Sequence, residues 1–505
     1  MTLIDHLGSL GLWIVVIDWT LRLLLVARVV LRRCPVPMSL SWILTLLLVP
    51  IPFVGLFVYF LIGESRLGQH RAKTIAQLTA AVEQRTIPYL QGRVQGWDEH
   101  DRTFNHMSRL CTAVGGLPPL GGNRLDLMGN APEVLDRLIA DIDAATHHCH
   151  LLYYIWMPAS RGLAVAEALM RAARRGVECR VLVDAVGSRP FLNSELPDQL
   201  RNAGVQVAAA LPVNPVRFLF ARLDLRNHRK IAIIDGIIAY CGSQNLTDET
   251  FRNRRHKKIG PWIDATVRVQ GPAAQALQII FLADWSINFE ENLDKMQQKL
   301  AEFFPRVQDV TPTIDAANRN AVHGSIVHVI PSGPGPQPDA IHQALLLMIF
   351  AANEEIILTT PYFVPDEATK NALVSAAVRG VDVTIVVPDH LDAKVVAAAS
   401  RAHYEDLLEA GVKIFEHTDG LLHAKTATID RKLAFVSSVN FDMRSFWLNF
   451  EATLFIYDDD FASVLRFMQQ GYLADSQQID LHHWRKRPPY RRFIDNAAQL
   501  LSPLL

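Results

Sequence analysis

The sequence lacks a surplus of either charge. Its 50 Lys and Arg residues balance 51 Asp and Glu residues, which gives a formal net charge of -1 at pH 7. A protein that binds nucleic acid over a broad surface normally carries a basic surplus, so this composition argues against a nucleic-acid partner. Any phosphate site must therefore depend on a local group of basic residues.

Cysteines are also few. The chain has 5 of them, scattered along its length, and no two show the C-x-x-C spacing of zinc or redox sites. The pattern predicts neither a disulfide framework nor a metal site, and we expect reduced, buried thiols and no cofactor. The cysteines are Cys34, Cys111, Cys149, Cys179 and Cys241.

Charged residues are absent from 34–63. Within this segment, 40–63 is long enough to cross a bilayer core, which takes roughly 20 apolar residues, and it predicts a transmembrane helix. A second apolar segment, 7–27, contains Asp18 and Arg22, whose spacing of four places them on one helical face, where they can pair with each other or face the neighbouring helix. Together the segments predict a two-helix transmembrane hairpin over 1–63. Basic residues flank both ends of 40–63, so its orientation stays open.

After a predicted helical connector at 64–110, the chain alternates short apolar runs with amphipathic segments, which indicates an α/β fold. The same order of strand, helix and strand occurs twice, about 200 residues apart, and this period is too long for a solenoid. We therefore expect two α/β halves, 111–305 and 306–505, packed as a pseudo-dimer. The predicted elements are strand 150–156, helix 162–176 and strand 177–185, then strand 355–363, helix 368–380 and strand 381–389.

Each predicted half contains one copy of a polar motif. "HRKIAIIDGIIAYCGSQN" covers 228–245, and "HAKTATIDRKLAFVSSVN" covers 423–440. Residues two apart in a strand point the same way, so each histidine shares a face with its lysine, while each aspartate, an odd number of positions away, falls on the other face. The aspartates are therefore expected to fix the turns after these strands. The residues concerned are His228, Lys230 and Asp235, and His423, Lys425 and Asp430.

Two histidines and two lysines in one site suit phosphodiester chemistry. One neutral imidazole can attack phosphorus, and the other, protonated, can give its proton to the leaving oxygen. The lysines would neutralise the non-bridging oxygens, and neighbouring hydroxyl and amide groups would donate hydrogen bonds without any metal. Those neighbouring groups are Ser243, Asn245, Ser438 and Asn440.

A nucleophilic histidine needs an acceptor that fixes its tautomer. Asp264 and Glu451 each follow one motif inside a short apolar segment that reads as the next strand. Either could be an ordinary edge-strand carboxylate, but their parallel placement favours orienting positions beside the two histidines.

These motifs resemble the paired HxKxxxxD motifs of the phospholipase D superfamily. The resemblance extends through "YYIW", "LRNHRK", "GPWID", "TPYFVPD", "VNFDMRSFWLNFE" and "LLSPLL" to the bacterial cardiolipin synthases over essentially the whole chain. It implies that the two His, Lys and Asp sets are catalytic, that Asp264 and Glu451 are the acidic partners of the histidines, and that Asn245 and Asn440 contact phosphate. One departure is Ser437, which stands where the first motif has Gly242.

The resemblance also implies a reaction and a location. One phosphatidylglycerol would pass its phosphatidyl group through a phosphohistidine to a second phosphatidylglycerol, giving cardiolipin and glycerol. The enzyme would be a multi-pass protein of the bacterial inner membrane, with its catalytic domain at the membrane surface among anionic lipids. A phospholipase D-type hydrolase is the alternative. The sequence leaves open which histidine is the nucleophile, whether phosphatidylethanolamine can be a donor, and the oligomeric state.

Overall fold

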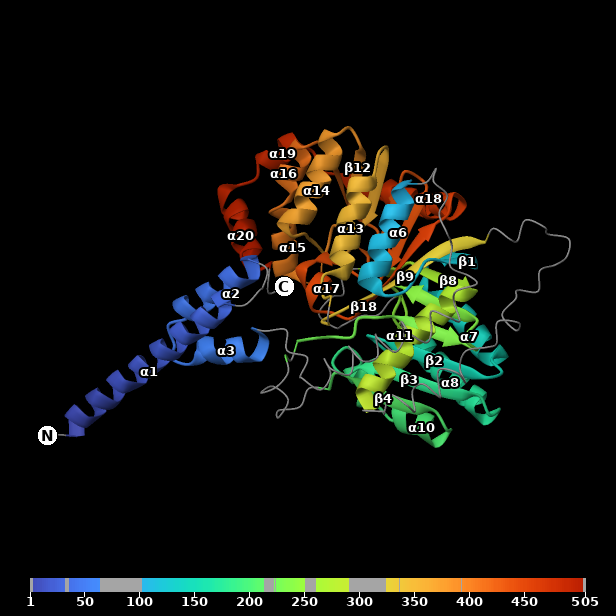
Figure 1. Cartoon of the computed structure of the whole chain (residues 1–505), viewed down its shortest axis with the longest axis horizontal. Helices are drawn as coiled ribbons and strands as arrows, with labels where there is room; N and C mark the ends of the chain where they lie inside the picture. Colours follow the sequence, from blue (N-terminus) through green and yellow to red (C-terminus); the bar gives the residue numbers. More distant parts are fainter. Residues whose placement is uncertain are drawn as a thin grey trace.

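The computed structural model describes residues 3–31, 36–63, 102–212, 222, 224–249, 260–289, 324–335, 337–391 and 393–502. Most of the predicted connector, 64–101, lies outside these residues, as do 290–323, where the two predicted halves meet in the sequence. Figure 1 shows an arm of three helices beside a body in which the first half of the fold lies below the second.

A single mixed sheet of 15 strands runs through the body. Its order is β4-β3-β2-β5-β6-β8-β1-β9-β18-β16-β15-β10-β12-β13-β19. The strands of the first half are β1 (Leu120–Met128), β2 (His148–Tyr153), β3 (Glu178–Asp184), β4 (Gln206–Ala210), β5 (Ile231–Ile234), β6 (Ile238–Gly242) and β8 (Thr266–Gln270). Those of the second are β9 (Ser325–Ser332), β10 (Glu355–Thr359), β12 (Asp382–Pro388), β13 (Lys413–His417), β15 (Thr426–Ile429), β16 (Leu433–Ser437), β18 (Glu451–Tyr457) and β19 (Ser476–Gln478).

The order of the strands repeats about the centre of the sheet. From β1 outward the first half runs β1-β8-β6-β5-β2-β3-β4, and from β9 outward the second half runs β9-β18-β16-β15-β10-β12-β13. β1 and β9 pair antiparallel, so the halves join edge to edge. The predicted duplication and pseudo-dimer are therefore confirmed, with β19 as an additional edge strand of the second half.

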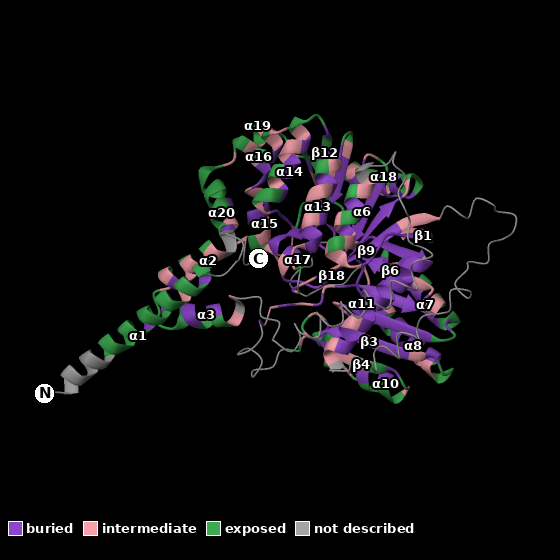
Figure 2. Cartoon of the chain, viewed as in Figure 1, coloured by how far each residue is buried: buried purple, intermediate pink, exposed green. Residues whose placement is uncertain are grey.

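Helices cover both faces of the sheet, and the strands between them are buried (Figure 2). α7 and α8 pack on the first half and α13 and α14 on the second, while the core beneath the seam takes side chains from α11 and α18. The helices of the body are α6 (Arg102–Gly115), α7 (Ala131–Ala144), α8 (Ser160–Arg174), α9 (Arg189–Leu192), α10 (Leu196–Asn202), α11 (Pro272–Phe289), α13 (Ala340–Ala351), α14 (Glu367–Val378), α15 (Lys394–Arg401), α16 (Tyr404–Glu409), α17 (Met443–Trp447), α18 (Asp459–Ala474), α19 (Leu481–Arg485) and α20 (Pro489–Gln499).

Two short strand pairs lie outside the large sheet. β7 (Trp262–Ile263) pairs with β14 (Leu421–Leu422), which joins the first half to the second. β11 (Phe363–Val364) pairs with β17 (Phe441–Asp442) inside the second half.

The arm consists of α1 (Leu3–Leu31), α2 (Val36–Leu48) and α3 (Val54–Ile62). The single transmembrane helix predicted over 40–63 is not found: it is divided into α2 and α3. Pro50 and Pro52 lie between them, and proline lacks the N–H that a continuous helix would use. Within the described residues, no helix combines the length and the apolar character that crossing a membrane requires.

Asp18 and Arg22 form the predicted pair, with Nε of Arg22 2.7 Å from Oδ2 of Asp18. Both are buried between the helices. Asp18 also accepts a hydrogen bond from the N–H of Phe53, just before α3. The guanidinium of Arg22 donates to the carbonyl oxygens of Leu46, Val49 and Ile51, so the pair stabilises the break between α2 and α3.

Candidate active site

The segment before each motif histidine pairs with the opposite half. The N–H of His228 donates to the carbonyl oxygen of Phe450 at 2.9 Å, and the N–H of His423 donates to that of Ile263 at 2.7 Å. Phe450 and Ile263 each immediately precede one of the two acids. This backbone register therefore places each histidine beside the acid of the other half.

The side chains complete the crossed arrangement. Nδ1 of His423 lies 2.6 Å from Oδ1 of Asp264, and Nδ1 of His228 lies 3.0 Å from Oε2 of Glu451. Both acids are buried. Burial alone would raise their pKa values, but the adjacent histidines and lysines lower them below the ordinary range, so both stay ionised.

The second ring nitrogen of each histidine is left for chemistry. Among the described residues, no hydrogen bond engages Nε2 of His228 or of His423. Burial lowers the pKa of each histidine to about 4, although the negative charge of the neighbouring acid acts to raise it. Both imidazoles are therefore neutral near pH 7, and a neutral imidazole whose Nδ1–H is held by a carboxylate carries its lone pair on Nε2.

The two lysines lie at the same centre. Nζ of Lys230 donates to the carbonyl oxygen of His228, and Nζ of Lys425 to that of His423, each at 2.5 Å. Burial lowers the pKa of Lys230 to about 8 and that of Lys425 well below its usual range. The carboxylates of Asp264 and Glu451 act in the opposite direction, because a nearby negative charge favours the protonated form of each lysine.

The serines contact the acids. Oγ of Ser243 donates to Asp264 at 2.6 Å, and Oγ of Ser438 donates to Glu451 at 2.5 Å. The sequence predicted these hydroxyls as hydrogen-bond donors near the phosphate or as orienting groups, and in the structure they lie behind the carboxylates; contact with a phosphate stays a prediction. Each serine therefore orients a carboxylate, and that carboxylate in turn orients a histidine.

The motif asparagines differ from each other. Oδ1 of Asn245 accepts the N–H of Ile155, which ties the motif to the end of β2. Asn440 is buried, and its Oδ1 has no hydrogen-bond partner among the described residues.

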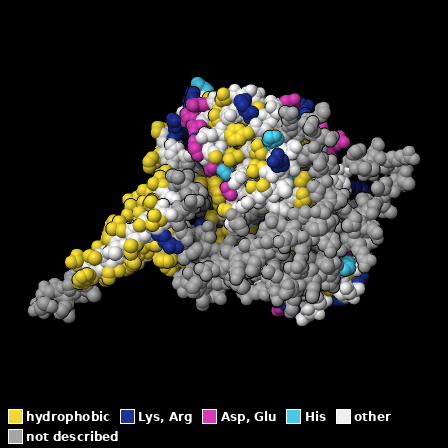
Figure 3. Space-filling model, in the orientation of Figure 1, with side chains coloured by type: hydrophobic (Ala, Val, Ile, Leu, Met, Phe, Trp, Pro, Cys, Tyr) yellow, Lys and Arg dark blue, Asp and Glu magenta, His cyan; other side chains and the backbone are white. Residues whose placement is uncertain are grey.

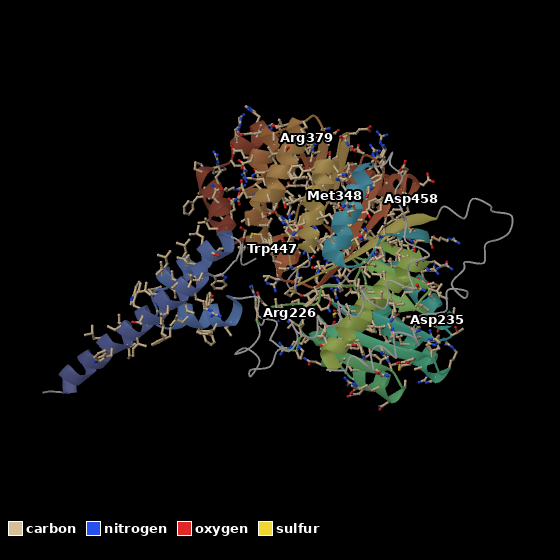
Figure 4. The ribbon with its side chains drawn as sticks, viewed as in Figure 1. Arg226, Asp235, Met348, Arg379, Trp447 and Asp458 are labelled. Atoms are coloured by element: carbon tan, nitrogen blue, oxygen red, sulfur yellow. The ribbon has the colours of Figure 1, made fainter. Side chains whose placement is uncertain are left out.

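Asp235 and Asp430 are not brought to this centre. Both follow the motif strands in the left-handed region, at φ 54° and 51°. Figure 4 shows Asp235 well apart from Arg226, which precedes His228 by two residues. The geometry therefore corrects the catalytic assignment implied by the resemblance and agrees with the turn function expected from spacing. Their carboxylates accept backbone N–H groups of Thr146, His147 and His148, and of Asn353, Glu354 and Glu355.

The difference between Gly242 and Ser437 has a steric cause. A Cβ at Gly242 would lie 2.3 Å from the carbonyl oxygen of Ala265, closer than side chains tolerate. At Ser437 the hydroxyl fits, bonding the hydroxyl of Thr453 at 2.7 Å and accepting the N–H of Val439. The departure at Ser437 is therefore accommodated by its half of the fold.

Sequence reasoning missed several supporting side chains. The ring centroid of Trp262 lies 4.5 Å from that of His423, and Tyr154 meets His228 edge-on at 4.7 Å. Arg229, inside the first motif, forms a buried ion pair with Asp284 at 2.6 Å. The aromatic residues stand in the quoted stretches "GPWID" and "YYIW", but no spacing rule links them to a particular histidine.

No group of three or more His, Cys, Asp or Glu residues in the described part of the chain could hold a metal ion. The centre itself consists of two crossed imidazole–carboxylate pairs and two lysines. A duplicated α/β fold with this centre at its interface defines a phospholipase D-like protein.

Comparison with known proteins supplies the narrower assignment. The family model described as "Cardiolipin synthase, PLD-like domain" matches residues 138–285 and 345–469. The chain is 38% identical to cardiolipin synthase A of Yersinia pseudotuberculosis serotype O:1b over 504 residues, covering 100% of this chain and 99% of that protein. It is 37% identical to cardiolipin synthase A of Serratia proteamaculans, with the same coverage. The chain belongs to the cardiolipin synthase family, and these matches support cardiolipin synthesis as its activity.

A solved structure supports the fold. The phosphatidylserine synthase of Haemophilus influenzae Rd KW20 aligns with a TM-score of 0.57 and 14% identity, covering 79% of this chain and 100% of that one.

Proposed function

We propose that this chain is a phosphatidyltransferase that makes cardiolipin and glycerol from two phosphatidylglycerol molecules. The observation that supports this most directly is the pair of crossed contacts, His228 with Glu451 and His423 with Asp264. Each contact holds one imidazole by Nδ1 and leaves Nε2 for the substrate. Two such imidazoles match a reaction that needs a nucleophile and a separate proton carrier.

In the first step, Nε2 of one neutral histidine attacks the phosphorus of the first phosphatidylglycerol. The N–P bond forms as the bond from phosphorus to the glycerol oxygen breaks, and the other histidine, protonated, gives its Nε2 proton to that oxygen. Glycerol leaves, and a phosphatidyl-histidine remains. Because burial disfavours the imidazolium, the bound phosphodiester anion must raise the pKa of the proton-carrying histidine. His228 and His423 divide these two parts between them.

In the second step, the primary hydroxyl of another phosphatidylglycerol gives its proton to the histidine that became neutral. Its oxygen attacks the phosphorus, the N–P bond breaks, and cardiolipin forms. If water took the place of this hydroxyl, the product would be phosphatidic acid, so the balance between transfer and hydrolysis depends on excluding water from the centre.

The other motif residues support these steps. Lys230 and Lys425 neutralise the non-bridging oxygens of the phosphodiester, and Asn245 and Asn440 contact the phosphate group. Asp264 and Glu451 stabilise the imidazolium when it forms. Ser243 and Ser438 keep the two carboxylates in position.

We assign the chain to the bacterial inner membrane. The arm of 1–63 would lie in the bilayer, with 64–110 as the connector and the catalytic halves, 111–305 and 306–505, at its surface. Support comes from the apolar side chains that cover α1–α3 (Figure 3). Trp13, Leu24 and Phe57 are exposed by 63%, 62% and 56%, which is unusual for side chains that contact only water.

The full-length protein, purified in detergent, tests the assignment when it is incubated with phosphatidylglycerol. Cardiolipin and free glycerol in equal amounts are the expected products. Phosphatidic acid without cardiolipin would overturn the transferase in favour of the hydrolase.

Two histidine variants and a matched control test the shared centre. His228→Ala and His423→Ala should each abolish turnover, whereas His390→Ala, at a side chain that is 71% exposed, should not. Quenching the reaction with labelled substrate should trap the phosphatidyl group on the variant that retains the nucleophile. Normal turnover in either active-site variant would contradict the proposal.

A further inference from the structure

α20 carries a row of apolar side chains that the described part of the chain leaves exposed. Tyr490, Phe493 and Ile494 are exposed by 60%, 74% and 53%, and Leu500 and Leu501 just beyond the helix by 71% and 47%. Their spacings of three, four and seven place them along one face of the helix. Only Asp495 and Ala498 of α20 are buried.

Ion pairs on the opposite side determine which way this face points. Asp495 accepts hydrogen bonds from Arg401 of α15 at 3.2 Å and from Arg487 at 2.9 Å. Arg492 pairs with Glu405 of α16 at 3.1 Å. Because α20 is held to the body by its polar side, its apolar side is directed away from the protein.

The surroundings of α20 indicate what covers this face. In Figure 1 the helix lies on the side of the body that carries α1–α3. Hydrophobic side chains cover that arm and are also found at the outer edge of the body near α20 (Figure 3). Lys486, three residues before α20, and Arg491, within it, are exposed. A helix with one apolar face and basic neighbours is suited to the interface of an anionic membrane.

We propose that α20 lies in the headgroup region of a bilayer of anionic phospholipids and is a second membrane contact, separate from the arm. Two contacts on one side of the body would hold it in one orientation, whereas the arm alone would let it turn. The inference goes beyond the reaction, because it needs no turnover and would hold for a catalytically inactive chain.

Spin labels on the full-length protein test the proposal. With Cys34 replaced by serine, the described native cysteines are all buried, so a label can be directed to Phe493→Cys or to Val378→Cys. Val378 is a matched control because it is 73% exposed, and its neighbour Arg379 lies far from the arm in Figure 4. Each protein is reconstituted into vesicles of phosphatidylglycerol and phosphatidylcholine.

The label at 493 should collide several-fold more often with oxygen, which concentrates in lipid, than with a water-soluble nickel chelate. The label at 378 should show the opposite preference. Arg491→Glu should reduce the lipid preference at 493, and vesicles of phosphatidylcholine alone should reduce it as well. Equal, water-like accessibility at both positions would overturn the proposal. Spin–spin broadening at 493 in detergent would also overturn it, because it would show that a second copy of the chain covers the face.

Discussion

Replacing Glu451 by glutamine is expected to disable His228 while preserving the shape of the site. The carboxylate of Glu451 receives Nδ1 of His228, the hydroxyl of Ser438 and Nδ2 of Asn449. Its two oxygens lie 2.9 and 3.0 Å from Nδ1 of His228, so both face donors. An amide has only one oxygen, and its NH2 group would meet a donor whichever way it turned.

The expected loss of rate follows from this mismatch. His228 would lose the acceptor that fixes its tautomer and the charge that stabilises its protonated form. Exchanging such a carboxylate for its amide in the Ser-His-Asp triad costs about 10⁴-fold in turnover, equivalent to about 5 kcal/mol of activation free energy. The free energy of unfolding should also fall by about 3 kcal/mol, because Lys230 and Lys425 would then face a single carboxylate.

Initial rates of cardiolipin formation in mixed micelles test this expectation. They are measured at a temperature at which a thermal unfolding curve shows that the variant is folded. Glu354→Gln is a matched control, since that side chain is 67% exposed and its ion pair is with Arg431, at the turn after the second motif strand, and not with a histidine or lysine of the centre. The control should retain full activity. A rate for Glu451→Gln within tenfold of the parent would refute an orienting function for this carboxylate.

Three further predictions concern stability. The pKa of His228 and of His423 is about 4 when folded and 6.5 when unfolded. The unfolded chain therefore binds more protons between these values, and the unfolding free energy should fall by about 3 kcal/mol per histidine from pH 6.5 to pH 4; a flat denaturation profile would contradict this. Gly242→Ser should lower the free energy of unfolding by about 1–3 kcal/mol through overpacking, and Ser437→Gly should lower it by about 1 kcal/mol through a lost hydrogen bond; an unchanged melting temperature in Gly242→Ser would contradict the steric account. Asp235→Ala should lower the melting temperature but leave turnover within a few-fold where the protein is folded, and a loss of orders of magnitude would return this aspartate to the chemistry.

Much of the body could be predicted from local patterns. The strand predicted at 177–185 is β3, and the helix predicted at 162–176 is α8, because apolar periodicity and a closing glycine depend on neighbouring residues only. The same reasoning identified both histidine and lysine pairs and separated Asp235 and Asp430 from them.

Contacts between distant segments could not be read in this way. Spacing selected Asp264 and Glu451, but nothing in the spacing says that each acid serves the histidine of the opposite half. That exchange depends on the pairing of β7 with β14 and of Asn227 with Phe450, between segments far apart in the chain. The division of the apolar run 40–63 into two helices was missed for another reason. The prediction used the average hydrophobicity of the run and did not consider that Pro50 and Pro52 would interrupt a helix.

Because each half supplies the acid for the histidine of the other half, the active site can form only late in folding. Each half on its own holds an imidazole without its carboxylate and a carboxylate without its imidazole. A slip of one residue between the halves, roughly 3.3 Å along a strand, would separate both pairs at once. A nascent or partly unfolded chain therefore has no reactive centre, and lipid chemistry begins only when both halves have folded and met in register.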